Sequence, residues 1–146
     1  MREVELNHIN INGIEYPLHC DLFALEVLQN DFQSVNKFER DLLGLTPLRD
    51  ENGEVKRNDE GVILNAQGEP KIGAIIKGLY VMIKEGQRIN GRQTGKEYEE
   101  ITYEEIGENC FIPFTELADI LHDEFNHSFS VKKKSSTKRP RKKNIS

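Results

Sequence analysis

The sequence predicts an α+β domain, in which an N-terminal β-hairpin packs on a predominantly helical domain of four to five helices. Two observations predict this class. Apolar and polar residues alternate from Ile9 to Leu18 around the turn dipeptide Asn12-Gly13. Five later stretches carry apolar residues at helical spacing and begin or end at residues that favour helix termini.

The first element is the hairpin. Its turn dipeptide suits a two-residue type I′ turn, in which both residues have positive φ. This turn pairs Ile11 with Ile14. It also pairs Ile9 with Tyr16, so that all four side chains share one face. A change of phase before Ile9 predicts a β-bulge near residues 7 and 8. Because a lone hairpin is marginally stable in water, we expect its apolar face to lie on helices.

Helix-terminus signals define the later elements. Asp21 and Ser34 suit N-caps, and Thr102 forms a capping-box pattern with Glu105. We expect Leu22 to belong to the buried stripe of the first helix. The expected helices run from Asp21 to a break at 31–33, from Ser34 to Gly44, from Pro70 to Gly86, from Tyr103 to about Asn109, and from Pro113 to about Asn126.

Charge divides the chain into an acidic α+β body, 1–130, and a basic tail, 131–146. Of the 20 Lys and Arg residues, eight lie in the tail, which has no acid, and the other 12 share the body with 25 acids. The body is therefore near −13 and the tail near +8. Because such a segment buries little apolar surface, we expect it to be disordered when free. The candidate contacts for a polyanion or an acidic partner are Lys132, Lys133, Lys134, Lys138, Arg139, Arg141, Lys142 and Lys143.

Residues 46–71 contain Pro and Gly among many charges. They predict a polar excursion on the surface, with a loose hairpin as one form that it can take. Two interpretations stay open, a loop that binds something and a mobile insertion without a specific role. We expect no internal repeat in the chain.

The motifs of catalysis and cofactor binding are incomplete. Gly91–Lys96 lies in a glycine-containing connection expected from 87 to 96. It does not match a phosphate-binding loop, because three residues instead of four separate its glycines. HExxH and GxSxG motifs are absent. We therefore expect no enzyme, no cofactor and no metal. A zinc site remains a minor alternative that requires the convergence of His19, Cys20, Cys110 and His122.

The cysteine spacing and the N-terminal charges favour a reducing compartment. No apolar run approaches the ~20 residues that span a bilayer. For the tail, two functions stay open. It can bind nucleic acid loosely, although it has no aromatic residue for base stacking. It can instead promote solubility or dock on an acidic protein surface, which we favour because the acidic body repels nucleic acid.

Four segments carry a family pattern: INGIEYPL at 11–18 with the amphipathic helix after it, AIIKGLYVMIKEG at 74–86, the acidic segment 100–108, and the expected helix 114–125. In composition and order they resemble the tail assembly chaperone family of long-tailed, siphovirus-type phages of Gram-positive bacteria. The resemblance covers residues 9–125. It does not include the excursion 46–71, which most members of the family lack.

This resemblance implies a non-enzymatic protein of the host cytoplasm that is absent from the mature virion. Its partners would be the tape measure protein, which it coats, and the tail tube protein, whose subunits it helps to recruit. The resemblance also implies a longer, frameshifted product, and the lysine runs at 132–134 and 142–143 are places where a ribosome can slip. The alternative is a small nucleic-acid-associated protein that binds polyanions through its basic C-terminal tail.

Overall fold

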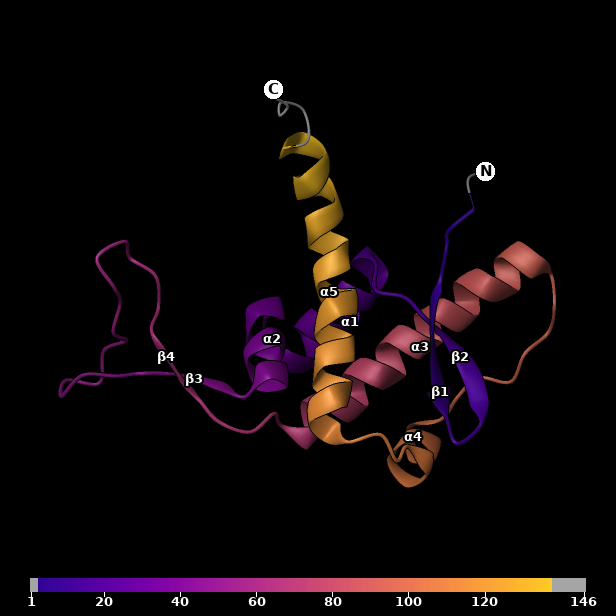
Figure 1. Cartoon of the computed structure of the whole chain (residues 1–146), viewed down its shortest axis with the longest axis horizontal. Helices are drawn as coiled ribbons and strands as arrows, with labels where there is room; N and C mark the ends of the chain where they lie inside the picture. Colours follow the sequence, from indigo (N-terminus) through magenta and orange to yellow (C-terminus); the bar gives the residue numbers. More distant parts are fainter. Residues whose placement is uncertain (1–2, 138–146) are drawn as a thin grey trace.

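The computed structural model describes the backbone of residues 3–137 and the side chains of residues 3–128. In that part of the chain, an antiparallel hairpin is followed by five helices, and a second small hairpin interrupts them (Figure 1). The predicted α+β class is therefore confirmed. The elements are β1 (Asn7–Ile11), β2 (Ile14–Leu18), α1 (Leu22–Phe32), α2 (Val35–Leu43), β3 (Leu45–Pro47), β4 (Asn65–Gln67), α3 (Ile72–Thr94), α4 (Tyr103–Asn109) and α5 (Phe114–Thr137).

The N-terminal hairpin forms in the predicted register. Ile11 pairs with Ile14, and Ile9 pairs with Tyr16. The two turn residues have φ values of 52° and 87°, and this positive sign is what a type I′ turn requires. The ladder is regular from Asn7 to the turn, so the expected bulge near residues 7 and 8 does not form. The residues whose phase suggested it precede the strand.

The hairpin lies on helices, as its marginal stability demands. β2 runs along α3, where the N–H of His19 donates to the carbonyl of Met82 at 3.0 Å. From β1, the side-chain amide of Asn7 donates to Glu124 of α5 at 2.7 Å. Ile14 is exposed at the turn, so one of the four side chains expected on the buried face lies in solvent. The strand register was therefore predictable from the sequence. How much of the hairpin's apolar face the helices would bury was not.

Three helices meet at the centre of the core. Phe38 of α2 and Leu121 of α5 are fully buried against Gly78 of α3. A Cβ atom at Gly78 would lie 3.1 Å from the Phe38 ring and 3.3 Å from Leu121. The absence of a side chain at this position lets both neighbours pack directly on the α3 backbone. Figure 1 shows α5 crossing α3 at this level, with α2 beside them.

α3 is longer than predicted because Gly86 does not end it. The helix continues to Thr94, and Gly95 is its C-cap with a φ of 72°. A Cβ atom at Gly86 would lie 2.5 Å from the carbonyl oxygen of Pro17. Gly86 therefore permits the close approach of β2 to the helix, a role that looks the same in sequence as a helix end. The expected connection from 87 to 96 is mostly helix.

At the start of α3, Pro70 was expected in the first turn but precedes the N-cap Lys71. The remaining helix ends agree with the prediction, except the end of α5. Asp21 and Ser34 each accept from the backbone N–H three residues on, at 3.0 and 2.9 Å. The capping box of α4 is present. α5, in contrast, reaches Thr137, past the expected end near Asn126, and its backbone includes the first part of the predicted tail. No Gly or Pro lies between these two residues to stop the helix.

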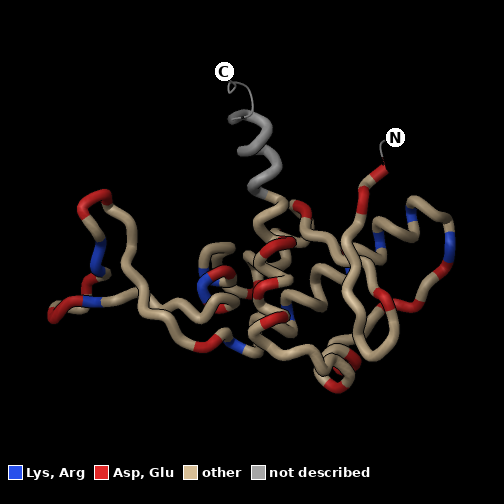
Figure 2. Tube along the Cα trace, in the orientation of Figure 1, with Lys and Arg blue, Asp and Glu red and all other residues tan. Residues whose placement is uncertain are grey.

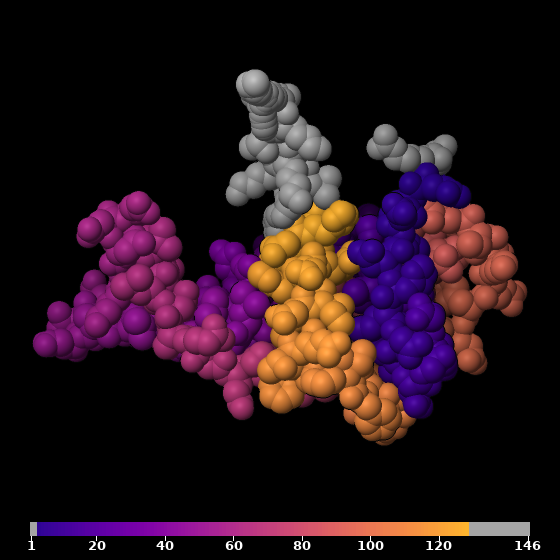
Figure 3. Space-filling model, viewed as in Figure 1, coloured from indigo at the N-terminus to yellow at the C-terminus, as the bar shows by residue number. Residues whose placement is uncertain are grey.

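Residues 45–67 form an arm that projects from the helical body (Figures 1 and 3). β3 and β4 pair antiparallel at its base. Beyond the base, the chain makes two loops, which are closed by single bridges between Arg49 and Val55 and between Arg57 and Ile63. Most side chains of the arm are exposed. The excursion expected at 46–71 is thus a compact three-part unit on a hairpin base.

The expectation of no internal repeat is wrong, because the two loops of the arm repeat an eight-residue unit. The units are RDENGEVK at 49–56 and RNDEGVIL at 57–64. In both, the first Arg donates to the carbonyl of the Gly, at 2.9 Å for Arg49 and 3.0 Å for Arg57. The side-chain oxygen of the second residue accepts two backbone N–H groups. Only Arg and Gly are identical between the units. The repeat is therefore clearer from the shared hydrogen bonds than from amino-acid identity.

The base and the two loops of the arm meet in a closed ring of backbone hydrogen bonds. Leu48 donates to Leu64 at 2.9 Å, Leu64 donates to Lys56 at 3.0 Å, and Lys56 donates to Leu48 at 2.8 Å. The three residues are spaced eight apart, one unit of the repeat. The arm is therefore organised by its backbone, with little buried side-chain surface.

Candidate functional site

Two grooves open beside the connection between α3 and α4, residues 96–102. We call the first the hairpin groove; it lies between β2, α3 and this connection and has a volume of about 700 Å³. The second, the helix groove, lies between α1, α3 and the connection and has a volume of about 340 Å³. Tyr98 and Glu100 line both. The connection begins with Lys96 and carries three glutamates after it, which Figure 2 shows as red segments along the connection.

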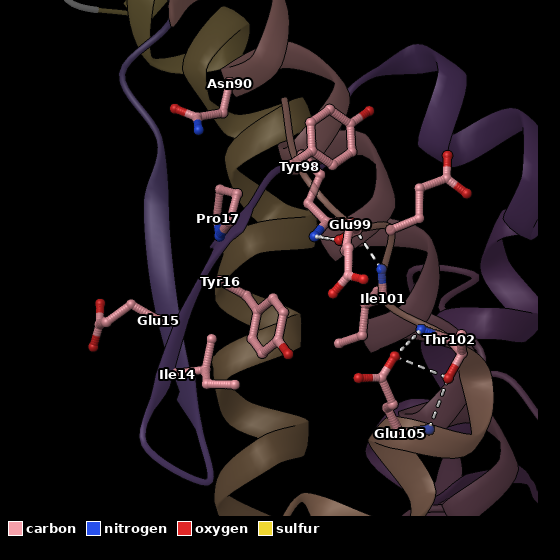
Figure 4. Close-up of a pocket in the computed structure, with 12 residues that line it drawn as sticks. Ile14, Glu15, Tyr16, Pro17, Asn90, Tyr98, Glu99, Ile101, Thr102 and Glu105 are labelled. Atoms are coloured by element: carbon pink, nitrogen blue, oxygen red, sulfur yellow. Dashed lines mark hydrogen bonds between the residues drawn. The ribbon is translucent and has the colours of Figure 1, made fainter. Parts of the chain in front are cut away.

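The hairpin groove has an apolar wall and an acidic wall. Figure 4 shows Ile14 and Tyr16 pointing from the hairpin into the gap, while Glu15 points away. The carboxylates of Glu99 and Glu105 lie across from them. The lining residues are Ile14, Glu15, Tyr16, Pro17, Gln87, Asn90, Tyr98, Glu99, Glu100, Ile101, Thr102 and Glu105, so the groove is lined by four acids and by no Lys or Arg.

The acidic wall is held in place by its own hydrogen bonds. The buried Gln87 donates to the carbonyl of Glu99 at 2.9 Å and accepts from the N–H of Ile101 at 3.1 Å. Glu105 accepts from both the N–H and the hydroxyl of Thr102 at 3.0 Å, in the capping box of α4. These bonds fix the backbone that carries the carboxylates, so the negative charge is preorganised.

The wall also acts on the phenol of Tyr16. Burial raises the pKa of Tyr16 above its ordinary value, and the charges of Glu105 and Glu99 raise it further. Both causes disfavour a negative phenolate beside carboxylates. The groove therefore favours positive charge, and its lining of tyrosine and aliphatic side chains suits the apolar stem of a lysine or arginine.

The helix groove is lined by apolar and aromatic side chains, together with charged side chains of both signs. Phe23 and Val27 of α1 face Tyr80 and Val81 of α3 across it. The Arg88 guanidinium lies 5.3 Å from the Phe23 ring centre, and the Lys84 ammonium lies 5.2 Å from that of Tyr80. Cationic side chains thus cover part of the aromatic surface.

Beside this groove, the carboxyl groups of Asp21 and Glu85 share a hydrogen bond. Burial raises the pKa of Asp21, and its hydrogen bond with Glu85 adds to the effect. Burial also acts against ionised Glu85, but the hydrogen bonds with Arg88 and Asp21 and the charge of Arg88 together outweigh it, so the pKa of Glu85 is lowered. Arg88 donates to both carboxylate oxygens of Glu85, at 3.0 and 2.6 Å. The pair therefore favours a charged Glu85 that anchors Arg88 over Phe23.

Two large apolar residues at the start of α1 are exposed, and one of them, Phe23, lines the helix groove. Leu22 is 81% exposed and Phe23 is 63% exposed, whereas Ala24, Leu25 and Leu28 are buried. The expected place of Leu22 in the buried stripe is therefore wrong, because within the first turn of α1 only Ala24 and Leu25 are buried. Helical spacing alone did not reveal that these two side chains are exposed. The one sequence feature that pointed to an exposed apolar surface was Phe23, which lies next to the apolar stripe and outside it.

The basic residues predicted as contacts cannot be placed against either groove. Lys132, Lys133 and Lys134 belong to the α5 backbone, but their side chains lie outside the described residues. The remaining five, Lys138, Arg139, Arg141, Lys142 and Lys143, lie wholly outside them, as does the rest of the tail expected to be disordered.

Residues 3–128 form neither the alternative zinc site nor a phosphate-binding loop. The four zinc candidates do not converge: His122 pairs with Glu39 at 2.9 Å, and no group of three or more His, Cys, Asp or Glu is placed to hold a metal there. Cys20 is buried and Cys110 is half-buried, both as free thiols. Gly91 packs under the Tyr98 ring in the last turns of α3, where no phosphate cradle forms.

Within the described residues, no helix has the length and apolar character needed to cross a membrane. Comparison with protein-family models, curated proteins and solved structures finds no match to this chain.

Proposed function

We propose that this protein is a non-enzymatic assembly chaperone, which holds an apolar helical segment of a partner protein on the helix groove and the adjoining turn of α1. By the family resemblance described above, the partner is a phage tape measure protein, and tail tube subunits are recruited to the complex. The observation that carries the proposal is the exposure of Leu22 and Phe23 beside an apolar groove.

Exposed apolar side chains that adjoin a groove are typical of protein-binding surfaces. An amphipathic helix binds such a groove through apolar side chains at positions i, i+3, i+4 and i+7. Tyr80, Val27 and Phe23 offer aromatic and aliphatic contacts to such a stripe. Lys84 and Glu100, 3.9 Å apart at the rim, offer partners of both signs to its flanking charges. The acidic body keeps the complex soluble.

The test is coexpression of the full chain with the tape measure protein of the same phage. We expect the wild-type chain to keep the large protein soluble and the double variant Leu22→Ser/Phe23→Ser to lose this activity. Phe111→Ser is the matched control, since Phe111 is 77% exposed but lines neither groove. Substitutions at such exposed sites change stability by roughly 0.5 kcal/mol or less, so folding is retained.

Circular dichroism of each variant checks that the fold is intact. If the tape measure protein is insoluble with the wild-type chain, the proposed function is wrong. If it is equally soluble with the double variant and with the control, the chaperone acts through another surface and the proposed site is wrong.

A further inference from the structure

We propose that the hairpin groove binds the Lys/Arg-rich C-terminal segment, residues 131–146, of a second copy of this chain. The site is separate from the helix groove, and the inference does not depend on the proposed chaperone function. It assigns a partner to the basic segment and links copies of the chain head to tail.

Charge complementarity is the first argument. The lining of the groove includes Glu99, Glu100 and Glu105 and no base, whereas residues 131–146 contain eight bases and no acid. The helix groove differs, because Lys84 and Arg88 line it and would repel such a segment. The arm differs as well, because its acids alternate with Arg49, Lys56 and Arg57. Of these three surfaces, the hairpin groove is therefore the one that best matches the segment.

The chemistry of the walls is the second argument. A lysine or arginine side chain has an apolar stem and a charged head, and it binds best where both are met. Ile14 and Tyr16 project into the gap as an apolar surface, and Glu99 and Glu105 lie opposite (Figure 4). Tyr98 adds an aromatic face, which attracts cations. An acidic loop without this apolar wall would attract the charge but would not hold the stem.

Chain length argues for a second copy over the same chain. The Ser128 hydroxyl donates to the carbonyl of Cys20, three residues from Pro17 at the groove. From there α5 runs on to Thr137, about 13 Å further at 1.5 Å per residue. Figure 1 shows α5 running away from the hairpin turn and α4, which bound the far end of the groove.

To return, the chain after Thr137 would retrace this distance and then cover roughly 10 Å along the hairpin, which takes about seven residues at ~3.3 Å each. Residues 138–144 would then be spent on the path. The five bases after Thr137 all lie within this stretch, so none of them would enter the groove. The basic residues of one chain thus reach the groove of another far more readily than their own.

The test uses the full-length chain in an equal mixture of normal and heavy-isotope forms. A zero-length carbodiimide cross-linker joins lysine amines to carboxylates in contact, and mass spectrometry identifies the joined peptides. We expect links between lysines of 132–143 and Glu99 or Glu105 that join a normal chain to a heavy one. Raising the salt from 0.05 to about 0.5 M is expected to remove most of them, because screening weakens such contacts.

The double variant Glu99→Gln/Glu105→Gln keeps the shape of the groove, since Gln also serves in a capping box. We expect it to weaken self-association about tenfold in sedimentation equilibrium. Glu51→Gln/Glu60→Gln is the matched control, because it removes the same charge from the two loops of the arm. We expect that control to associate as the wild type does.

Three results would overturn the proposal: links found only within single chains, links spread over exposed acids in general, or equal association by the two double variants. None of them bears on tape measure solubility, which tests the helix groove. Conversely, an inactive helix groove leaves these cross-links unchanged, so the two proposals fail separately.

Discussion

The helical body and the arm are stabilised in opposite ways. In the body, large side chains such as Phe38 and Leu121 are fully buried, and hydrogen bonds follow from the helices that carry them. In the arm, most side chains are exposed, and backbone and side-chain hydrogen bonds define the shape. A single chain thus combines a unit specified by packing with a unit specified by turn chemistry. The difference predicts that mutations act globally in the body and locally in the arm.

The largest effect is expected from removing a ring at the centre of the body. Phe38→Ala should lower the free energy of unfolding by about 3–5 kcal/mol, since it leaves a cavity against Gly78 and Leu121. Urea denaturation followed by circular dichroism measures the change. Val62→Ala, at an exposed position of the arm, is the control and should shift the midpoint little. If both variants lost a similar free energy of unfolding, the proposed difference between the body and the arm would be wrong.

A smaller, pH-dependent effect is expected from Cys20. Burial raises the pKa of its thiol from 9 to about 11, and the nearby Glu124 and Asp21 add to the shift, so the thiol contributes stability in full below pH 9. This contribution is lost as the pH rises through 11. Two pKa units correspond to about 2–3 kcal/mol. The arm contains no Cys, so it has no buried thiol of this kind.

Urea denaturation of the wild type and Cys20→Ala at pH 8 and pH 10.5 tests this prediction. The wild type should lose more stability between the two values than the variant does. Because other groups titrate in both proteins, the difference between the two losses is the quantity to compare. Identical losses would show that the Cys20 thiol ionises in the folded protein as readily as in the unfolded one.

The smallest effect is expected in the arm. Asp50→Ala removes a side-chain oxygen that accepts from the N–H groups of Asn52 and Glu54, at 2.9 and 3.0 Å. These bonds are exposed, so the loss should be about 1 kcal/mol and local. Hydrogen exchange should accelerate at amides of the arm, with no change at the amides of α3.

Asn58→Ala makes the equivalent change in the second loop and serves as the matched variant. Each substitution should loosen its own loop more than the other. A fall in the urea midpoint of the whole protein beyond about 1 kcal/mol would mean that the arm supports the body, against the comparison drawn above.

Local signals predicted most of the fold. The hairpin register follows from a turn dipeptide with a strong conformational preference, and the starts of α1, α2 and α4 follow from their caps. These features depend on residues within a few positions of one another. Gly86 was misjudged because its role depends on Pro17, which is distant in sequence. The sequence does not distinguish a glycine that ends a helix from a glycine that lets a strand approach the helix closely.

The grooves were harder to predict than the elements. Neither the acidic wall nor the exposure of Phe23 can be read from helical spacing, since both depend on which surfaces the tertiary fold leaves uncovered. The glutamates near 97–108 were visible as a cluster, but their position opposite Tyr16 was not. The repeat in the arm was missed because its units share hydrogen-bonded roles and only two identical residues.

The ring formed by Leu48, Lys56 and Leu64 makes the arm modular. Excising residues 49–56 would put Leu48 directly before Arg57, in the place that Lys56 now occupies. Leu48 could then exchange both of its hydrogen bonds with Leu64, and the ring would collapse to an ordinary hairpin pair in unchanged register. Inserting another unit would widen the ring by one member. The length of the arm can thus change in steps of eight residues without disturbing the anchorage of its base, so the position is a natural place for grafting foreign loops.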